Sequence, residues 1–151
     1  MDAFTPLQLD AVLAVAHHLV VFPLVAVLVA ELVVLAEPLD AGRLRRLGRL
    51  DAAYGGLAAL AIVAGLLRAV FGAKGWGFYA GNPVFWAKLG VFALIGLLSI
   101  VPTVRLAGWR RAGLVPDAAA QRATRSWVVG EAVLLPLLPV LAVLMARGIG
   151  H

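Results

Sequence analysis

Four long apolar runs, separated by short polar segments, dominate the chain. Each run predicts a membrane-spanning helix, because about 20 apolar residues in a helix cross ~30 Å of hydrocarbon. We place the spans at about 9–36, 52–71, 84–107 and 127–146. This pattern predicts an all-α, integral membrane antiparallel four-helix bundle, which we treat as one transmembrane domain over residues 1–151.

Prolines and the N-terminal flank refine these spans. Pro23, Pro136 and Pro139 should bend the first and fourth spans, because a proline removes one helical hydrogen bond. The segment before the first span carries no Lys or Arg, unlike a signal peptide, so we expect this span to stay in the mature protein. With only four spans, a homodimer is a further candidate arrangement.

Composition supports a lipid bilayer as the surroundings. Hydrophobic residues make up 63% of the chain and its mean hydropathy is +0.99, well above the soluble range. The chain contains no cysteine, which excludes disulfides and thiolate metal sites.

The positive charge predicts how the protein is oriented in the membrane. It does not call for a nucleic-acid partner. The formal net charge is +5, and most arginines fall in two of the connections between spans. Lys and Arg in short loops stay in the cytoplasm, so both termini should lie outside, on the periplasmic face of a bacterial inner (plasma) membrane. Those arginines are Arg43, Arg45, Arg46, Arg49, Arg110, Arg111, Arg122 and Arg125.

The outer half of the predicted bundle contains four basic side chains. A count of ~1.5 Å per residue from each interface places His17, His18, Arg68 and Lys88 there. Ionisable groups at such depth commonly mark a functional site. An imidazole can ligate iron or copper, and Arg68 and Lys88 can hold carboxylates such as porphyrin propionates. Alternatively, Arg68 and Lys88 extend to the interface as simple anchors.

Aromatic residues near these basic side chains also have two possible roles. They either shape an apolar slot for a ligand or form the belt usual at a membrane interface. These residues are Trp76, Phe78, Tyr79, Phe85 and Trp86.

The inner half is acidic. Glu31 and Glu131 lie inside spans, and Asp51 and Arg105 lie at the inner ends of spans. Buried carboxyls suit proton handling, but the alternative is an ion pair of either glutamate with Arg105, or a protonated glutamate bonded to a neighbouring carbonyl. At ~100° per residue, His17 and Glu31 fall within about 40° of each other, so we favour His17 over His18 for the inward face.

Three stretches resemble a known family. The run AHHLVVFPLVAVLVAE, then RLDAAYGG, then GLLRAVFGAKGWGFYAGNPVFWAKLGVFALIGLLSIVPT look like the bacterial predicted membrane proteins of domain-of-unknown-function family 2214. The resemblance covers about Ala16 to Trp109 and implies a four-helix membrane fold without an established activity.

A more distant resemblance links the chain to HemJ-type protoporphyrinogen oxidases and CopD copper-resistance membrane domains. These have a first-helix His, a second-helix Arg and a W-x-x-K-like element, here Trp86-Ala87-Lys88 with one residue fewer. In the HemJ type the histidine is implicated in binding haem b, and a lysine that opens a later helix is also important. The resemblance therefore implies haem b and oxidoreductase chemistry at His17 or His18, with Arg68 and Lys88. A bis-histidine haem site needs a second histidine ligand from another span, and the only histidine outside the first span is the terminal His151.

These observations lead to three functional hypotheses. The first is a protein that binds haem b or a related tetrapyrrole in its outer half for redox or tetrapyrrole chemistry. The second is a small transporter in which Glu31, Glu131 and the histidines relay protons or bind a metal ion such as copper. The third is a non-catalytic membrane assembly subunit.

Overall fold

The computed structural model describes residues 5–150, and helices account for nearly all of this range. No strand occurs between residues 5 and 150. His151 lies outside the described residues. The helices are α1 (Pro6–Ala36), α2 (Ala41–Phe71), α3 (Gly75–Ala80), α4 (Pro83–Ala112), α5 (Ala118–Leu134) and α6 (Leu137–Ala146).

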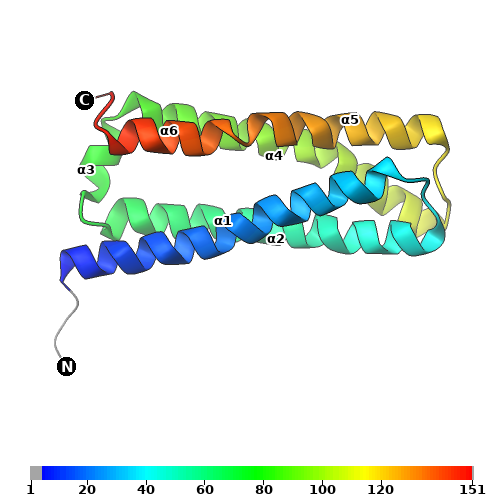
Figure 1. Cartoon of the computed structure of the whole chain (residues 1–151), viewed down its shortest axis with the longest axis horizontal. Coiled ribbons are helices and arrows are strands. Elements are labelled where there is room, and N and C mark those ends of the chain that lie inside the picture. The colour runs from blue at the N-terminus through cyan, green and yellow to red at the C-terminus, as the bar shows by residue number, and fades with distance from the viewer. Residues whose placement is uncertain (1–4, 151) are drawn as a thin grey trace.

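The long helices lie side by side along the length of the molecule, and successive ones run in opposite directions (Figure 1). α1 packs mainly on α2, and α4 packs on both α5 and α6. Contacts of α1 with α5 and of α2 with α4 join these two groups. α1 begins and α6 ends at one end of the molecule, here called the terminal end, beside the short α3 (Figure 1). The opposite end is called the arginine-rich end.

Four helical stretches are long and apolar enough to cross a membrane: Pro6–Ala36, Ala41–Phe71, Pro83–Ala112 and Ala118–Ala146. Large apolar side chains on their outer surfaces are widely exposed, for example Leu19 (68%) and Val133 (69%). In water this exposure would be costly, whereas in a bilayer these side chains contact lipid. The predicted membrane-spanning helices are thus present.

The arginine-rich segments differ from the prediction, which was wrong in treating 37–51 and 108–126 as loops. α2 begins at Ala41 and α4 continues to Ala112, so the actual connections are four and five residues long, 37–40 and 113–117. Asp40 and Asp117 cap α2 and α5, and their carboxylates accept hydrogen bonds from the backbone N–H groups of Arg43 and Ala120 at 2.7 Å. Arg, Leu and Ala are good helix formers, so the helices extend beyond the hydrocarbon.

The prolines have different consequences. α1 continues through Pro23, and α4 continues through Pro102. The fourth span is interrupted at Leu135 and Pro136, which separate α5 from α6. Pro139 cannot donate to the Leu135 carbonyl, which instead accepts a hydrogen bond from the Leu138 N–H at 3.1 Å. The fourth span therefore consists of two helices.

The larger buried cluster lies toward the arginine-rich end, and a smaller one forms around Phe85 where α2, α3 and α4 meet. In the larger cluster, Leu28, Leu47, Leu106 and Val128 meet from four helices and are at most 1% exposed. In contrast, no residue of α6 is buried, and no described residue of α1 before Leu24 is buried. The terminal half of the molecule, which contains the histidines, is therefore less tightly packed than the other half.

Candidate functional site

His17 lies on α1 against a small-residue face of α2. Its Cε1 atom would lie 3.4 Å from a Cβ at Gly65, and the ring also interacts with the Ala61 backbone carbonyl. The spacing Ala61-xxx-Gly65 thus makes room for the imidazole. Its Nδ1 atom is buried and has no hydrogen-bond partner. Such an unpaired nitrogen is costly to bury, and it is a potential ligand atom.

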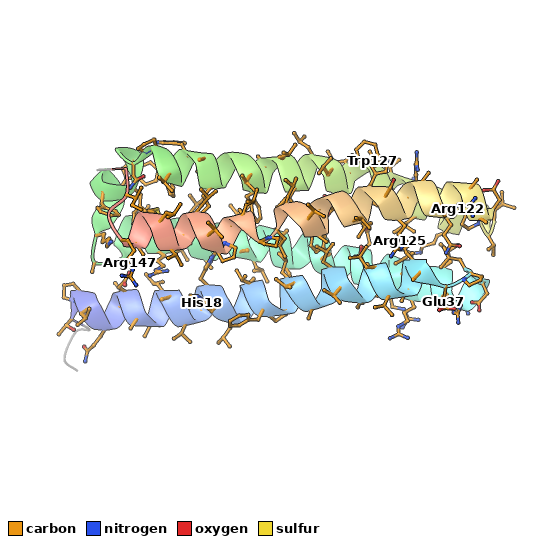
Figure 2. All side chains as sticks on the ribbon, turned by 45° about the horizontal axis from the view of Figure 1, so that its top comes forward. His18, Glu37, Arg122, Arg125, Trp127 and Arg147 are labelled. Atoms are coloured by element: carbon orange, nitrogen blue, oxygen red, sulfur yellow. The ribbon has the colours of Figure 1, made fainter. Side chains whose placement is uncertain are left out.

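His18 has a different environment. Its side chain is exposed, and its Nδ1 lies 2.6 Å from the backbone oxygen of Ala14, one turn earlier on α1. Its ring also lies 5.9 Å from that of Phe22. His18 is therefore bonded within its own helix, in the terminal half of α1 (Figure 2).

Lys88 and Arg68 converge with His17 from two other helices. Both cations are close enough to His17 to interact with it electrostatically, and they interact with each other. Lys88, on α4, is partly buried and has no carboxylate within ion-pair distance among residues 5–150. We call His17, Arg68 and Lys88 the basic cluster.

Asp10 is the acidic neighbour of this cluster. Its Oδ1 atom lies 3.6 Å from Arg68 Nε, and both side chains remain partly exposed. Arg68 Nε itself is buried without a hydrogen bond. Asp10 pairs with Arg68 and not with Lys88, so the cluster keeps a positive excess that favours an anionic ligand.

The aromatic residues pack against one another. Phe85 is at the centre, with ring centroids 6.0 Å from Trp76, 5.5 Å from Tyr79 and 5.5 Å from Trp86. The Trp86 indole N–H donates to the Ala80 carbonyl at 2.9 Å. These contacts pack α3 against the start of α4. The pKa of Tyr79, outside the spans, is raised by burial.

A second group of polar residues lies in the core. Glu31 on α1 and Glu131 on α5 are 2% and 1% exposed. Each has one carboxyl oxygen without a partner, while Tyr54 of α2 hydrogen-bonds to Glu131. Glu31 interacts electrostatically with both Glu131 and Asp51. We call Glu31, Asp51 and Glu131 the carboxylate layer.

Arg105 does not pair with these glutamates. Among residues 5–150 the recorded ion pair is Arg68–Asp10, and Arg105 Nη1 instead donates to Thr124 Oγ1 at 3.4 Å. Thr124 precedes Glu131 by seven residues, or about 10 Å along α5. The Asp51 carboxylate accepts a hydrogen bond from the Thr103 hydroxyl at 2.7 Å. The ion pair of Arg105 with Glu31 or Glu131 is therefore not formed in the structure.

Two cavities lie away from the basic cluster. The smaller, about 60 Å³, is lined by Asp51 and Tyr54 together with residues of α4, including Ser99 and Thr103. The larger lies at the arginine-rich end. No group of three or more His, Cys, Asp or Glu side chains that could hold a metal ion is found in the described part of the chain.

Sequence reasoning missed three partners in these sites. Asp10 lies seven residues before His17, so helical periodicity alone puts both on one face of α1. Tyr54 and Thr103 were visible as polar residues in apolar runs, but their partners come from other helices. Such pairings depend on how the helices pack.

Comparison with known proteins supports the membrane assignment. A family described as "Predicted membrane protein (DUF2214)" matches residues 9–150, nearly the whole chain. No curated protein and no solved structure gives a significant match.

Proposed function

The chain belongs to the DUF2214 family of predicted membrane proteins, and we propose that it binds haem b or a related anionic tetrapyrrole at the basic cluster. The observation that carries this proposal is the convergence of His17, Arg68 and Lys88 from three helices. The distant resemblance to HemJ-type oxidases involves the same three positions. We further propose that the helices form an antiparallel bundle in a bacterial inner membrane with both termini outside.

The residues present fit such a ligand. The imidazole of His17 has a buried nitrogen without a partner and can act as an iron ligand. Arg68 and Lys88 supply two cations in a membrane setting, where unpaired charge is costly, and two propionates would neutralise them. Neither α6 nor the part of α1 before Leu24 has a buried side chain, which leaves this half of the bundle less tightly packed. Bound haem would supply one-electron redox chemistry.

Each residue of the cluster has a separate role in this proposal. His17 would hold the metal, and the small residues Ala61 and Gly65 would fix the position of its ring on α2. Arg68 and Lys88 would bind carboxylates and so orient the ligand. Asp10 would pair with Arg68 until a ligand carboxylate replaces it, and it leaves Lys88 free of a carboxylate.

Titration of purified apoprotein with hemin tests the role of the two cations. The double substitution Arg68→Gln with Lys88→Gln should weaken binding at least tenfold, since charge-assisted bonds contribute about 1.5–3 kcal/mol each. The control replaces Lys74 and Arg147, two cations of the terminal end, with glutamine and should bind like the wild type. Equal affinity of the cluster variant and the control would contradict the proposal.

A second candidate function is proton transfer through the carboxylate layer. It is favoured by the two nearly inaccessible carboxyls, each with an unpartnered oxygen, next to Tyr54. The cavity of about 60 Å³ beside Asp51 is large enough for water, which could extend such a path.

Proton flux into proteoliposomes tests this second candidate. A potassium gradient with valinomycin should drive proton uptake by the wild type, and the double substitution Glu31→Gln with Glu131→Gln should abolish it. Glu37→Gln, at an exposed residue after α1, is the matched control and should retain uptake. Wild-type uptake no faster than that of empty vesicles would rule out this function.

A further inference from the structure

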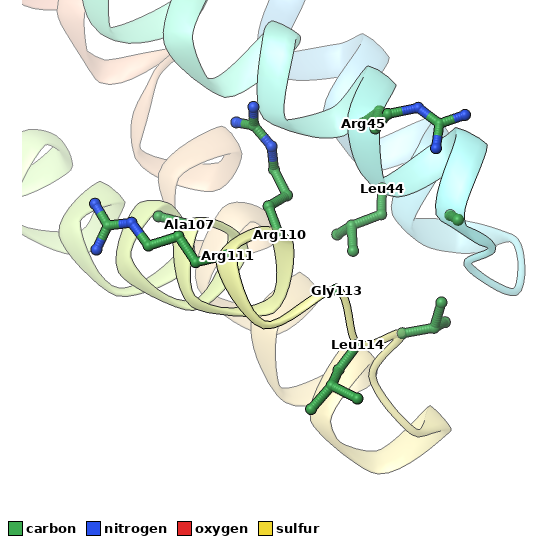
Figure 3. Close-up of a pocket in the computed structure, with 9 residues that line it drawn as sticks. Leu44, Arg45, Ala107, Arg110, Arg111, Gly113 and Leu114 are labelled. Atoms are coloured by element: carbon green, nitrogen blue, oxygen red, sulfur yellow. The ribbon is translucent and has the colours of Figure 1, made fainter.

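A pocket at the arginine-rich end shares no lining residue with the basic cluster or the carboxylate layer. It has a volume of about 520 Å³ and lies between the first turns of α2, the last turns of α4 and the following connection. Three of its lining residues are Arg45, Arg110 and Arg111, and none of the described lining residues is acidic. In Figure 3 the side chain of Arg110 extends toward α2, whereas those of Arg45 and Arg111 extend to opposite sides of Arg110.

Among residues 5–150, the arginines of this pocket have only longer-range carboxylate neighbours, Asp51 for Arg110 and Asp40 for Arg45. None of the three arginines forms an ion pair within the described range. Asp40 also caps α2 by accepting a hydrogen bond from the Arg43 backbone N–H. This bond lowers the pKa of Asp40, so Asp40 stays ionised and committed to the cap at neutral pH.

Arg110 is held in place by the fold. Its side chain crosses Gly48 of α2, where a Cβ would overlap its Cδ and Cζ atoms. Gly48 therefore lets the side chain extend from α4 toward α2, as Figure 3 shows. The arginine stays close to the pocket even though its end is exposed.

The remaining lining of the pocket is apolar. Leu44 is buried on α2 and points toward Gly113, whereas Leu114 (65% exposed) and Val115 (46% exposed) follow α4 (Figure 3). Exposed apolar residues next to arginines match a ligand with an anionic group and a hydrocarbon part. Basic pockets between transmembrane helices on the cytoplasmic side bind anionic lipid headgroups in this way.

We propose that this pocket binds an anionic phosphate group, presented by an acidic phospholipid of the adjoining leaflet. The arginines hold the phosphate, since guanidinium groups match its geometry with paired hydrogen bonds. Leu114 and Val115 contact the glycerol and the start of the acyl chains. A bound lipid would join α2 to α4 at the end where the connections are short.

Lipid binding to the purified full-length protein tests this site. Mass spectrometry of the intact protein in neutral detergent counts bound dioleoyl phosphatidylglycerol against dioleoyl phosphatidylcholine. Replacing Arg45, Arg110 and Arg111 with glutamine should weaken binding of phosphatidylglycerol on the order of fivefold per arginine. The control variant replaces Arg46, Arg122 and Arg125, exposed arginines of the same end outside the pocket, and should bind like the wild type.

The outcomes separate the alternatives. Equal losses in both variants would overturn the proposal, because that result means binding by general surface charge. Equal wild-type binding of the two lipids would also overturn it, because the protein would then not recognise an anionic headgroup. A competition arm with inorganic phosphate identifies the source of the anion. Displacement of the lipid by millimolar phosphate supports a phosphate site whose occupant is the free ion, and resistance to displacement supports the lipid. Thermal midpoints of both variants verify that they fold.

Discussion

Charge balance around Arg68 determines what the basic cluster can bind. Asp10 is the one carboxylate within 4 Å of a cluster cation in the described residues, and a ligand carboxylate would compete with it for the guanidinium. His17 and Lys88 have no such competitor. The cluster thus combines a histidine nitrogen without a partner with cations that the protein leaves incompletely neutralised.

This balance predicts the effect of Asp10→Asn. Removing the competing carboxylate should strengthen hemin binding by up to about fivefold, since partly exposed ion pairs are worth ~0.2–1 kcal/mol. Hemin titration of the purified variant measures the change. Asp117→Asn, which keeps a capping side chain at the other end of the molecule, is the control. Weaker binding by Asp10→Asn would show that Asp10 positions Arg68 and does not compete for it.

Single residues also show how far sequence reasoning reaches. The helical wheel favoured His17 for the inward face, and the structure buries Nδ1 of His17 while exposing His18. The partner of Arg105 could not be inferred in the same way. Thr124 and Glu131 are both buried on α5, and only the axial position of α4 relative to α5 decides which one Arg105 reaches.

At the scale of elements, Gln121 joins the α1–α2 connection to α5. Its amide donates to the carbonyls of Leu35 and Glu37 at 3.0 and 2.7 Å, and its Oε1 accepts from the Leu39 N–H at 3.2 Å. One side chain thus satisfies three backbone groups where the chain leaves α1. This short connection depends on a residue more than 80 positions away.

Gln121→Leu should therefore destabilise the protein. The substitution leaves three backbone groups without their partner, and each buried unsatisfied group costs about 1–3 kcal/mol. Thermal unfolding in detergent, followed by size-exclusion chromatography, should show a lower midpoint than the wild type. Arg122→Gln changes the exposed neighbouring residue and should leave the midpoint unchanged. An unchanged midpoint for Gln121→Leu would mean that water replaces the amide.

Elements were predictable where composition alone decides them. The four apolar runs became the four helical spans, because their length and hydropathy leave few alternatives in a membrane. The helical extensions through 41–51 and 108–112 were missed, since their arginines suggested loops although arginine is a good helix former. The short α3 was also missed, because its aromatic packing on α4 involves tertiary contacts.

At the scale of the whole molecule, the arginines define two unlike ends. Arg122 and Arg125 lie at the end opposite His18 and Arg147, as Figure 2 shows. Retention of positive loops in the cytoplasm then predicts that the terminal end faces outward. The basic cluster lies in the half that would face the periplasm, and the arginine-lined pocket would adjoin the cytoplasmic leaflet.

Cysteine accessibility tests this orientation directly, because the chain contains no native cysteine. Ala73→Cys, between α2 and α3, should react with a membrane-impermeant maleimide in cells with a permeabilised outer membrane. Ala119→Cys, at the start of α5, should react only after lysis. Both alanines are exposed, so access to the side chain is matched. The reverse labelling pattern would place the termini in the cytoplasm.

The absorption spectrum of the purified protein tests the central claim most directly. Wild type, His17→Ala and His18→Ala are expressed with ample haem supply, and oxidised and dithionite-reduced spectra are followed by a pyridine haemochrome assay. The account predicts a b-type spectrum in the wild type and His18→Ala, and its loss in His17→Ala. A colourless wild type, or a full Soret band in His17→Ala, would contradict the assignment of His17 as the haem ligand.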